Sequence, residues 1–71
     1  MKLVTFYNTT TAMMFEDVAK ENEFQGRLIP LPPSIGAGCG FSWLTNSNSQ
    51  QINSFIVKNQ LEYEDIYDYK E

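Results

Sequence analysis

Residues 2–15 read Lys-Leu-Val-Thr-Phe-Tyr-Asn-Thr-Thr-Thr-Ala-Met-Met-Phe, a β-branched and aromatic run that changes into an amphipathic pattern. β-Branched and aromatic side chains favour strands, so residues 2–7 predict a first strand. The amide and hydroxyl side chains of residues 8–11 are typical caps of a helix start. Apolar residues then follow at helical spacing: Ala12, Phe15 and Ala19, with Met14 and Val18 beside them. We therefore expect a strand followed at once by an amphipathic helix over about residues 9–22.

The middle of the chain predicts two strands around an irregular segment. Residues 27–31 read Arg-Leu-Ile-Pro-Leu, and a proline cannot donate to a strand ladder, so this strand belongs at an edge of the sheet. Residues 32–40 carry prolines and glycines and predict a loop. Residues 41–44, Phe-Ser-Trp-Leu, alternate as a third strand.

The last third predicts a second helix and a closing strand. Ser47-x-x-Gln50 matches a capping box, and Ile52, Phe55 and Ile56 then share one face of a helix over about residues 48–59. Residues 61–69 predict the fourth strand. The order β-α-β-β-α-β indicates an α+β, ferredoxin-like split βαβ fold, with both helices on one face of an antiparallel sheet in the order 4-1-3-2.

Length and charge restrict the classes of function. Seventy-one residues allow one domain, 1–71, and bury little apolar surface, so a homodimer is a natural way to gain stability. The net charge is −4, and five of the nine acids lie in residues 62–71. No basic cluster is present to neutralise phosphates, so we expect no nucleic-acid partner. No apolar run is long enough to span a membrane, no signal peptide is evident, and a lone cysteine agrees with a reducing compartment, so we expect a cytoplasmic protein.

The residues that are absent narrow the chemistry further. The chain has no histidine and one cysteine, which excludes a Cys-His or Ser-His-Asp arrangement, a histidine-containing zinc site and an internal Cys-x-x-Cys pair. It also has neither a phosphate-binding GxxxxGK[ST] loop nor a GxGxxG motif. We therefore expect no metal and no cofactor, and a self-contained enzyme is disfavoured.

Cys39 is the single candidate for a reactive group. In the predicted topology, the loop that carries it lies at the same end of the sheet as the helix start at Thr9, Thr10 and Thr11, whose amides favour a thiolate. Gly38 and Gly40 remove side chains around the sulfur, so the backbone there can form a concavity lined by N–H groups. We expect Cys39 as nucleophile, with these glycines and threonine amides stabilising its anion.

Three plainer interpretations stand beside this one. A lone cysteine is often a small buried hydrophobic residue, and a glycine-rich stretch is often only a hairpin connection. The large aromatic residues are expected in the core rather than around a ligand: Phe6, Phe15, Trp43 and Phe55.

Tyr63, Tyr67 and Tyr69 share strand parity with Asp65, and on the helix-free face they would form a surface for a partner or a second copy.

The chain resembles a family of short domains described as putative selenium/sulfur carrier protein-like. The resemblance covers nearly the whole chain and rests on five segments: Thr5-Phe6, Thr11-Ala12, Ile29-Pro30-Leu31-Pro32, Gly38-Cys39-Gly40 and Glu62-x-x-x-Ile66-Tyr67. It implies that Cys39 carries sulfur or selenium as a persulfide or perselenide between a donor and an acceptor protein. Family members usually have a basic residue directly after Pro-x-Pro, where this chain has Pro33.

Two other functions remain open at this stage. One is a non-catalytic interaction or regulatory module, as a monomer or a homodimer, that uses the tyrosine-rich sheet face. The other is a small-ligand sensor on the same fold, for which the sequence offers no motif.

Overall fold

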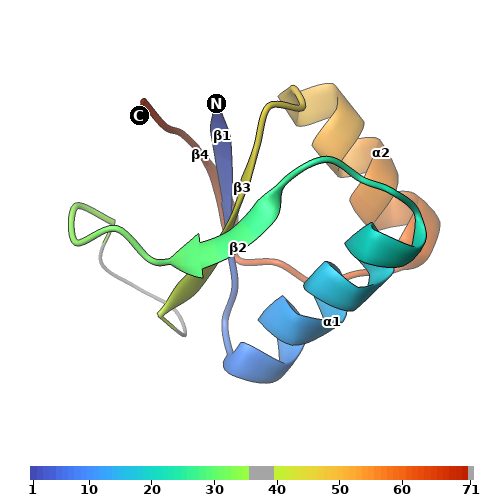
Figure 1. Cartoon of the computed structure of the whole chain (residues 1–71), viewed down its shortest axis with the longest axis horizontal. Helices are drawn as coiled ribbons and strands as arrows, with labels where there is room; N and C mark the ends of the chain where they lie inside the picture. Colours follow the sequence, from blue (N-terminus) through green and yellow to red (C-terminus); the bar gives the residue numbers. More distant parts are fainter. Residues whose placement is uncertain (36–39, 71) are drawn as a thin grey trace.

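The structure is a computed structural model, and it describes residues 1–35 and 40–70. Its elements are β1 (Lys2–Thr5), α1 (Thr9–Glu21), β2 (Arg27–Pro30), β3 (Phe41–Thr45), α2 (Ser49–Asn59) and β4 (Asp65–Asp68) (Figure 1). The strands form one sheet in the order β2-β3-β1-β4, and every neighbouring pair is antiparallel. The predicted split βαβ order and sheet arrangement are therefore confirmed.

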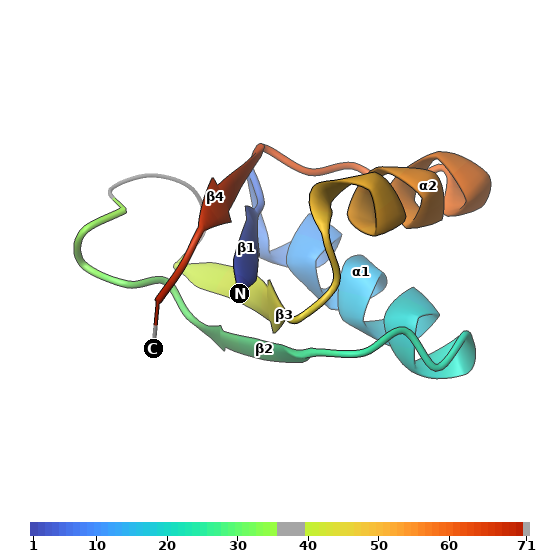
Figure 2. The ribbon, with the colours of Figure 1, turned by 90° about the horizontal axis from the view of Figure 1, so that it is seen from above.

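Both helices pack on one face of the sheet, as Figure 2 shows from above. Val4 lies opposite Trp43 on β3 and Ile66 on β4, and this row faces the helices because cross-strand partners share a face. Phe15 of α1 joins the layers, since its ring centroid lies 5.5 Å from that of Trp43 and 5.4 Å from that of Phe55 on α2. Phe6, Phe15, Trp43 and Phe55 are thus core residues, as expected.

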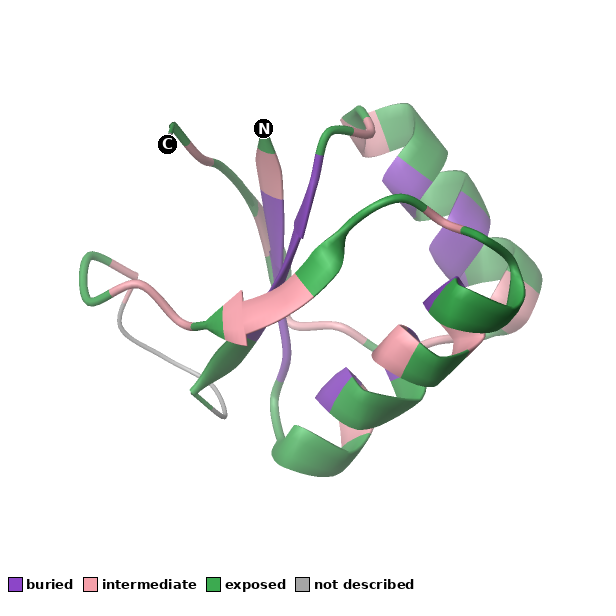
Figure 3. Cartoon of the chain, viewed as in Figure 1, coloured by how far each residue is buried: buried purple, intermediate pink, exposed green. Residues whose placement is uncertain are grey.

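The helix-free face of the sheet is also closed to solvent at its centre. Leu3 and Leu44 are opposite each other on this face and are only 0% and 2% exposed. Figure 3 shows buried residues along β1 and β3 as well as on the inner sides of both helices. The chain from Leu31 to Ile35 leaves β2 on the side of the sheet away from the helices (Figures 1 and 2).

The starts of both helices are closed by asparagine side chains. Asn8 caps α1 by accepting a hydrogen bond from the Thr11 amide at 2.8 Å. For α2, the predicted capping box at Ser47 and Gln50 is wrong by one residue. Asn48 accepts from the Gln51 amide at 2.8 Å, and the Gln51 side chain accepts from the Asn48 amide at 2.9 Å. Asparagine caps a helix as well as serine does, so Ser47 and Asn48 both match the capping-box pattern.

The fourth strand is shorter than the predicted span of residues 61–69. α2 ends at Asn59, its C-cap Gln60 has a left-handed φ of 54°, and the following residues lead to β4 without pairing as a strand until Asp65. Tyr63 packs against the core between sheet and helices instead of sharing a face with Tyr67. Tyr67 lies opposite Leu3 on the helix-free face and is 36% exposed. The surface of three tyrosines on one face is therefore not formed.

Candidate functional site

Two of the expected site residues, Gly38 and Cys39, lie outside the described residues, so the site is built from the chain on either side of them. Gly40 is exposed and has a φ of 89°, a left-handed conformation that side chains with a Cβ rarely adopt. The space where a Cβ would stand is open for 4 Å around. Glycine at position 40 is thus required by its backbone angle and not by crowding.

The base of the loop is held by a main-chain hydrogen bond and a turn. The Leu31 amide donates to the Gly40 carbonyl oxygen at 2.8 Å, which extends the β2–β3 pairing by one residue. The Ile35 amide then donates to the Pro32 carbonyl oxygen at 3.0 Å and closes a turn over residues 32–35. Pro33 occupies the second position of this turn, where its fixed φ is favoured, and it is exposed. Pro33 therefore has a local structural role in this turn.

The described end of the loop lies at the same end of the sheet as the start of α1. Ser42 of β3 pairs with Thr5, the last residue of β1, and Thr9 begins α1 four residues after Thr5. Figure 1 shows the start of β3 and the first turn of α1 together at this end of the molecule. The chain that follows Cys39 is consequently anchored next to the β1–α1 junction.

The three threonines at the start of α1 are not equivalent. The amide and the hydroxyl of Thr11 both donate to Asn8 Oδ1 at 2.8 Å. Thr9 and Thr10 are exposed, and within the described part of the chain their amides have no hydrogen-bond partner, as is usual in the first turn of a helix. These two amides remain available to an anion, whereas the Thr11 amide is engaged by the cap.

Acidic residues limit how strongly this end of the protein attracts anions. Asp65 lies opposite Thr5, and Thr5 lies opposite Ser42, so Asp65 and Ser42 are separated by two strand spacings, about 10 Å. At the other end of β4, Lys2 pairs with Asp68 and lowers the pKa of that carboxyl group, first by its hydrogen bond and then by its charge. Lys2, the basic residue of β1, is therefore at the opposite end of the strand from the β2–β3 loop that carries Cys39.

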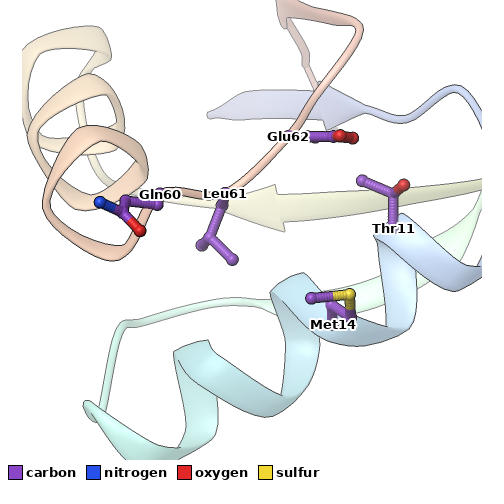
Figure 4. A pocket seen from close by; sticks show the side chains of 5 residues that line it. All are labelled: Thr11, Met14, Gln60, Leu61 and Glu62. Atoms are coloured by element: carbon purple, nitrogen blue, oxygen red, sulfur yellow. The ribbon is translucent and has the colours of Figure 1, made fainter.

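A hollow of about 180 Å³ lies beside the candidate site, on the helix side of the sheet. Figure 4 shows Thr11 and Met14 of α1 facing the connection between α2 and β4, and the five lining residues are Thr11, Met14, Gln60, Leu61 and Glu62. Sequence reasoning missed this hollow because it depends on the left-handed turn at Gln60, which no motif marks. Among residues 1–35 and 40–70, no group of three His, Cys, Asp or Glu side chains is placed to hold a metal.

The architecture defines the class of protein as a small ferredoxin-like split βαβ domain with a long β2–β3 loop. The family described as "Putative Se/S carrier protein-like" matches residues 2–68, and the chain belongs to this family. No curated protein and no solved structure matches the chain significantly. In the described ranges, neither helix is long and apolar enough to cross a membrane.

Proposed function

We propose that Cys39 is a sulfur or selenium carrier that accepts a terminal sulfur or selenium atom from a donor protein and passes it to an acceptor protein. The observation that carries this proposal is the family match over residues 2–68, which includes the loop with Cys39. The protein requires no histidine for this role, because exchange depends on the thiolate fraction, its nucleophilicity and access. The cytosol is the compartment that would keep a lone thiol reduced between transfers.

The transfer step balances without an external oxidant. The Cys39 thiolate attacks the terminal sulfur of a persulfide on the donor, a new S–S bond forms at Cys39, and the S–S bond of the donor breaks. The donor leaves as a thiolate and takes up a proton from solvent. The same step in reverse order, with an acceptor thiolate attacking the terminal sulfur on Cys39, completes the relay.

The residues around the loop support this step in defined ways. Gly38 and Gly40 carry no side chain that would hinder a protein partner, and the exposed amides of Thr9 and Thr10 lie at the positive end of α1, which we expect to favour the anion. Pro33 stands in the loop where relatives carry a base, so the anionic sulfur depends on main-chain donors here. We therefore expect a thiol that is moderately, not strongly, activated.

Mass spectrometry tests the proposal directly. The protein is incubated with a cysteine desulfurase and cysteine, and we expect one added sulfur atom, about 32 Da, on Cys39 that a thiol reductant removes. Cys39→Ser is the control for the site, and a parallel reaction with selenocysteine in place of cysteine distinguishes the two elements. The absence of any reducible adduct on Cys39, with an alkylation midpoint at the ordinary thiol value of about 8.5, would leave a non-catalytic interaction module as the function.

A further inference from the structure

The outer edge of β4 carries main-chain groups that face away from the sheet. β4 is the last strand of the sheet on the β1 side, and the Tyr69 amide donates to the Met1 carbonyl oxygen at 2.8 Å. Antiparallel pairs alternate between hydrogen-bonded and non-hydrogen-bonded positions, so Tyr67 and Asp65 also bond to β1. The amides and carbonyls of Ile66 and Asp68 therefore point outward, where no other strand of the described chain lies.

One of these outward groups is held by a neighbouring side chain. The Ile66 amide donates to Asp65 Oδ1 at 2.8 Å, which agrees with its direction away from β1. Such a local bond is the kind that a side chain offers in place of a ladder partner. It satisfies the Ile66 amide in the free protein, and it is exposed to solvent, so an incoming carbonyl group can replace it.

The charge of this edge selects the kind of strand that fits it. Residues 62–68 contain four acids and no base, Glu62, Glu64, Asp65 and Asp68, and one carboxylate oxygen of Glu64 is buried. Only Asp68 is neutralised by an ion pair within the described chain, through Lys2. A second copy of the chain would bring the same acids against each other, because an antiparallel pairing places like charges across the interface. The edge is therefore complementary to a basic segment and not to itself.

We propose that the β4 edge binds an extended, lysine- or arginine-rich segment of a partner protein by strand addition. A carbonyl of the segment accepts the Ile66 hydrogen bond, and the freed Asp65 carboxylate pairs with a basic side chain of the segment. Tyr67, on the same face as Asp65 and part-exposed, lies beside the stem of that side chain. This inference is independent of Cys39 and would stand if the carrier proposal failed.

The test uses the intact protein and a short peptide, acetyl-Lys-Thr-Lys-Val-Lys-Thr-amide, followed by amide NMR. We expect the largest shifts and the greatest slowing of hydrogen exchange at the Ile66 and Asp68 amides. A control peptide of the same sequence with an N-methyl group on every backbone amide lacks the donors for strand pairing and keeps the charge, and it should produce no slowing. Equal effects of both peptides, or shifts centred away from β4, would overturn the proposal.

Charge variants distinguish a specific ion pair between Asp65 and the peptide from general attraction between an acidic protein and a basic peptide. Asp65→Asn keeps an oxygen that can cap Ile66 but removes the charge, so peptide binding should weaken about three-fold, the effect of one exposed ion pair. Asp17→Asn makes the same charge change on the exposed side of α1 and should leave binding unchanged. An equal loss in both variants would mean non-specific attraction. If raising the protein concentration alone shifts the Ile66 and Asp68 amides, the occupant is a second copy and the proposal is wrong.

Discussion

The Leu31 amide bonds to the carbonyl oxygen of Gly40, one residue beyond the final Pro30–Phe41 pair of β2 and β3. This bond brings together the two ends of the segment that carries Cys39. Leu31 and Gly40 are therefore tethered to each other, and the backbone of Gly40 is left-handed. We expect the position of the Cys39 thiol relative to the β1–α1 junction to depend on the backbone angle of Gly40.

Gly40→Ala should lower stability because alanine is strained at a φ of 89°, although its Cβ meets no atom within 4 Å. We expect a loss of about 1–2 kcal/mol in urea unfolding, and a changed rate of Cys39 alkylation, since the loop must shift to relieve the strain. Gly40→Asn is the matched control, because asparagine tolerates positive φ better and should lose less. Identical urea midpoints for wild type and Gly40→Ala would contradict the role of this backbone angle.

Gly26→Ala should be more damaging than Gly40→Ala, although both glycines have positive φ. A Cβ at position 26 would overlap the buried Trp43 indole nitrogen and would lie 2.6 Å from the Leu44 carbonyl oxygen. Neither the Leu44 backbone nor the packed Trp43 indole can move without disturbing the core. We therefore expect the free energy of unfolding to fall by about 3 kcal/mol or more, with altered Trp43 fluorescence. The difference between the two alanine variants measures the overlap, and a smaller loss at Gly26 would refute it.

The buried faces of both helices follow from the sequence because they depend on local periodicity, and the sheet order follows from the β-α-β-β-α-β order of the elements. Ala12, Phe15 and Ala19 repeat at helical spacing, and all three are fully buried. The start of α2 was placed one residue early, because Ser47 and Asn48 each precede a glutamine by three residues and only the geometry shows which side chain bonds.

That choice can be tested by truncating each candidate cap. Asn48→Ala removes the acceptor of the Gln51 amide and should destabilise the protein by about 1 kcal/mol, whereas Ser47→Ala should change stability by less than about 0.5 kcal/mol. Thermal or urea unfolding of the two variants side by side decides the assignment. Equal losses would mean that the capping role is shared.

The candidate site was less accessible to sequence reasoning than the fold. The shared end of the loop and α1 follows from topology alone, and the pairing of Ser42 with Thr5 agrees with it. The different hydrogen bonding of the three threonines does not follow from topology. It arises because the Asn8 side chain accepts hydrogen bonds from Thr11, and this depends on the rotamers of the two side chains. Cys39 lies outside the described residues, and its placement beside the start of α1 stays a prediction.

The Lys2–Asp68 pair predicts a small dependence of stability on acid. Lys2 lowers the pKa of Asp68 from 3.8, so its contribution is present above that value and is lost as the pH falls through the lower pKa of the folded state. NMR titration of the Asp68 carboxyl group should show the lowered pKa, and Lys2→Met should return it toward 3.8. High salt should reduce the difference between the two proteins, because the pair is exposed. A titration of Asp68 that is the same with and without Lys2 would exclude the interaction.

Pro33→Lys should restore the basic residue that the family usually carries after Pro-x-Pro and should strengthen the attraction of the Cys39 loop for anions. Position 33 is exposed in the turn of residues 32–35, so a lysine fits without displacing core atoms. At low ionic strength we expect Cys39 to react about three-fold faster with the anionic disulfide dithiobis(nitrobenzoate), and no faster with neutral dithiodipyridine. Pro33→Ala separates the loss of proline, which costs about 0.4–1 kcal/mol of stability, from the gain of charge. If Pro33→Ala and Pro33→Lys accelerate the anionic reagent equally, loop flexibility and not charge controls access to Cys39.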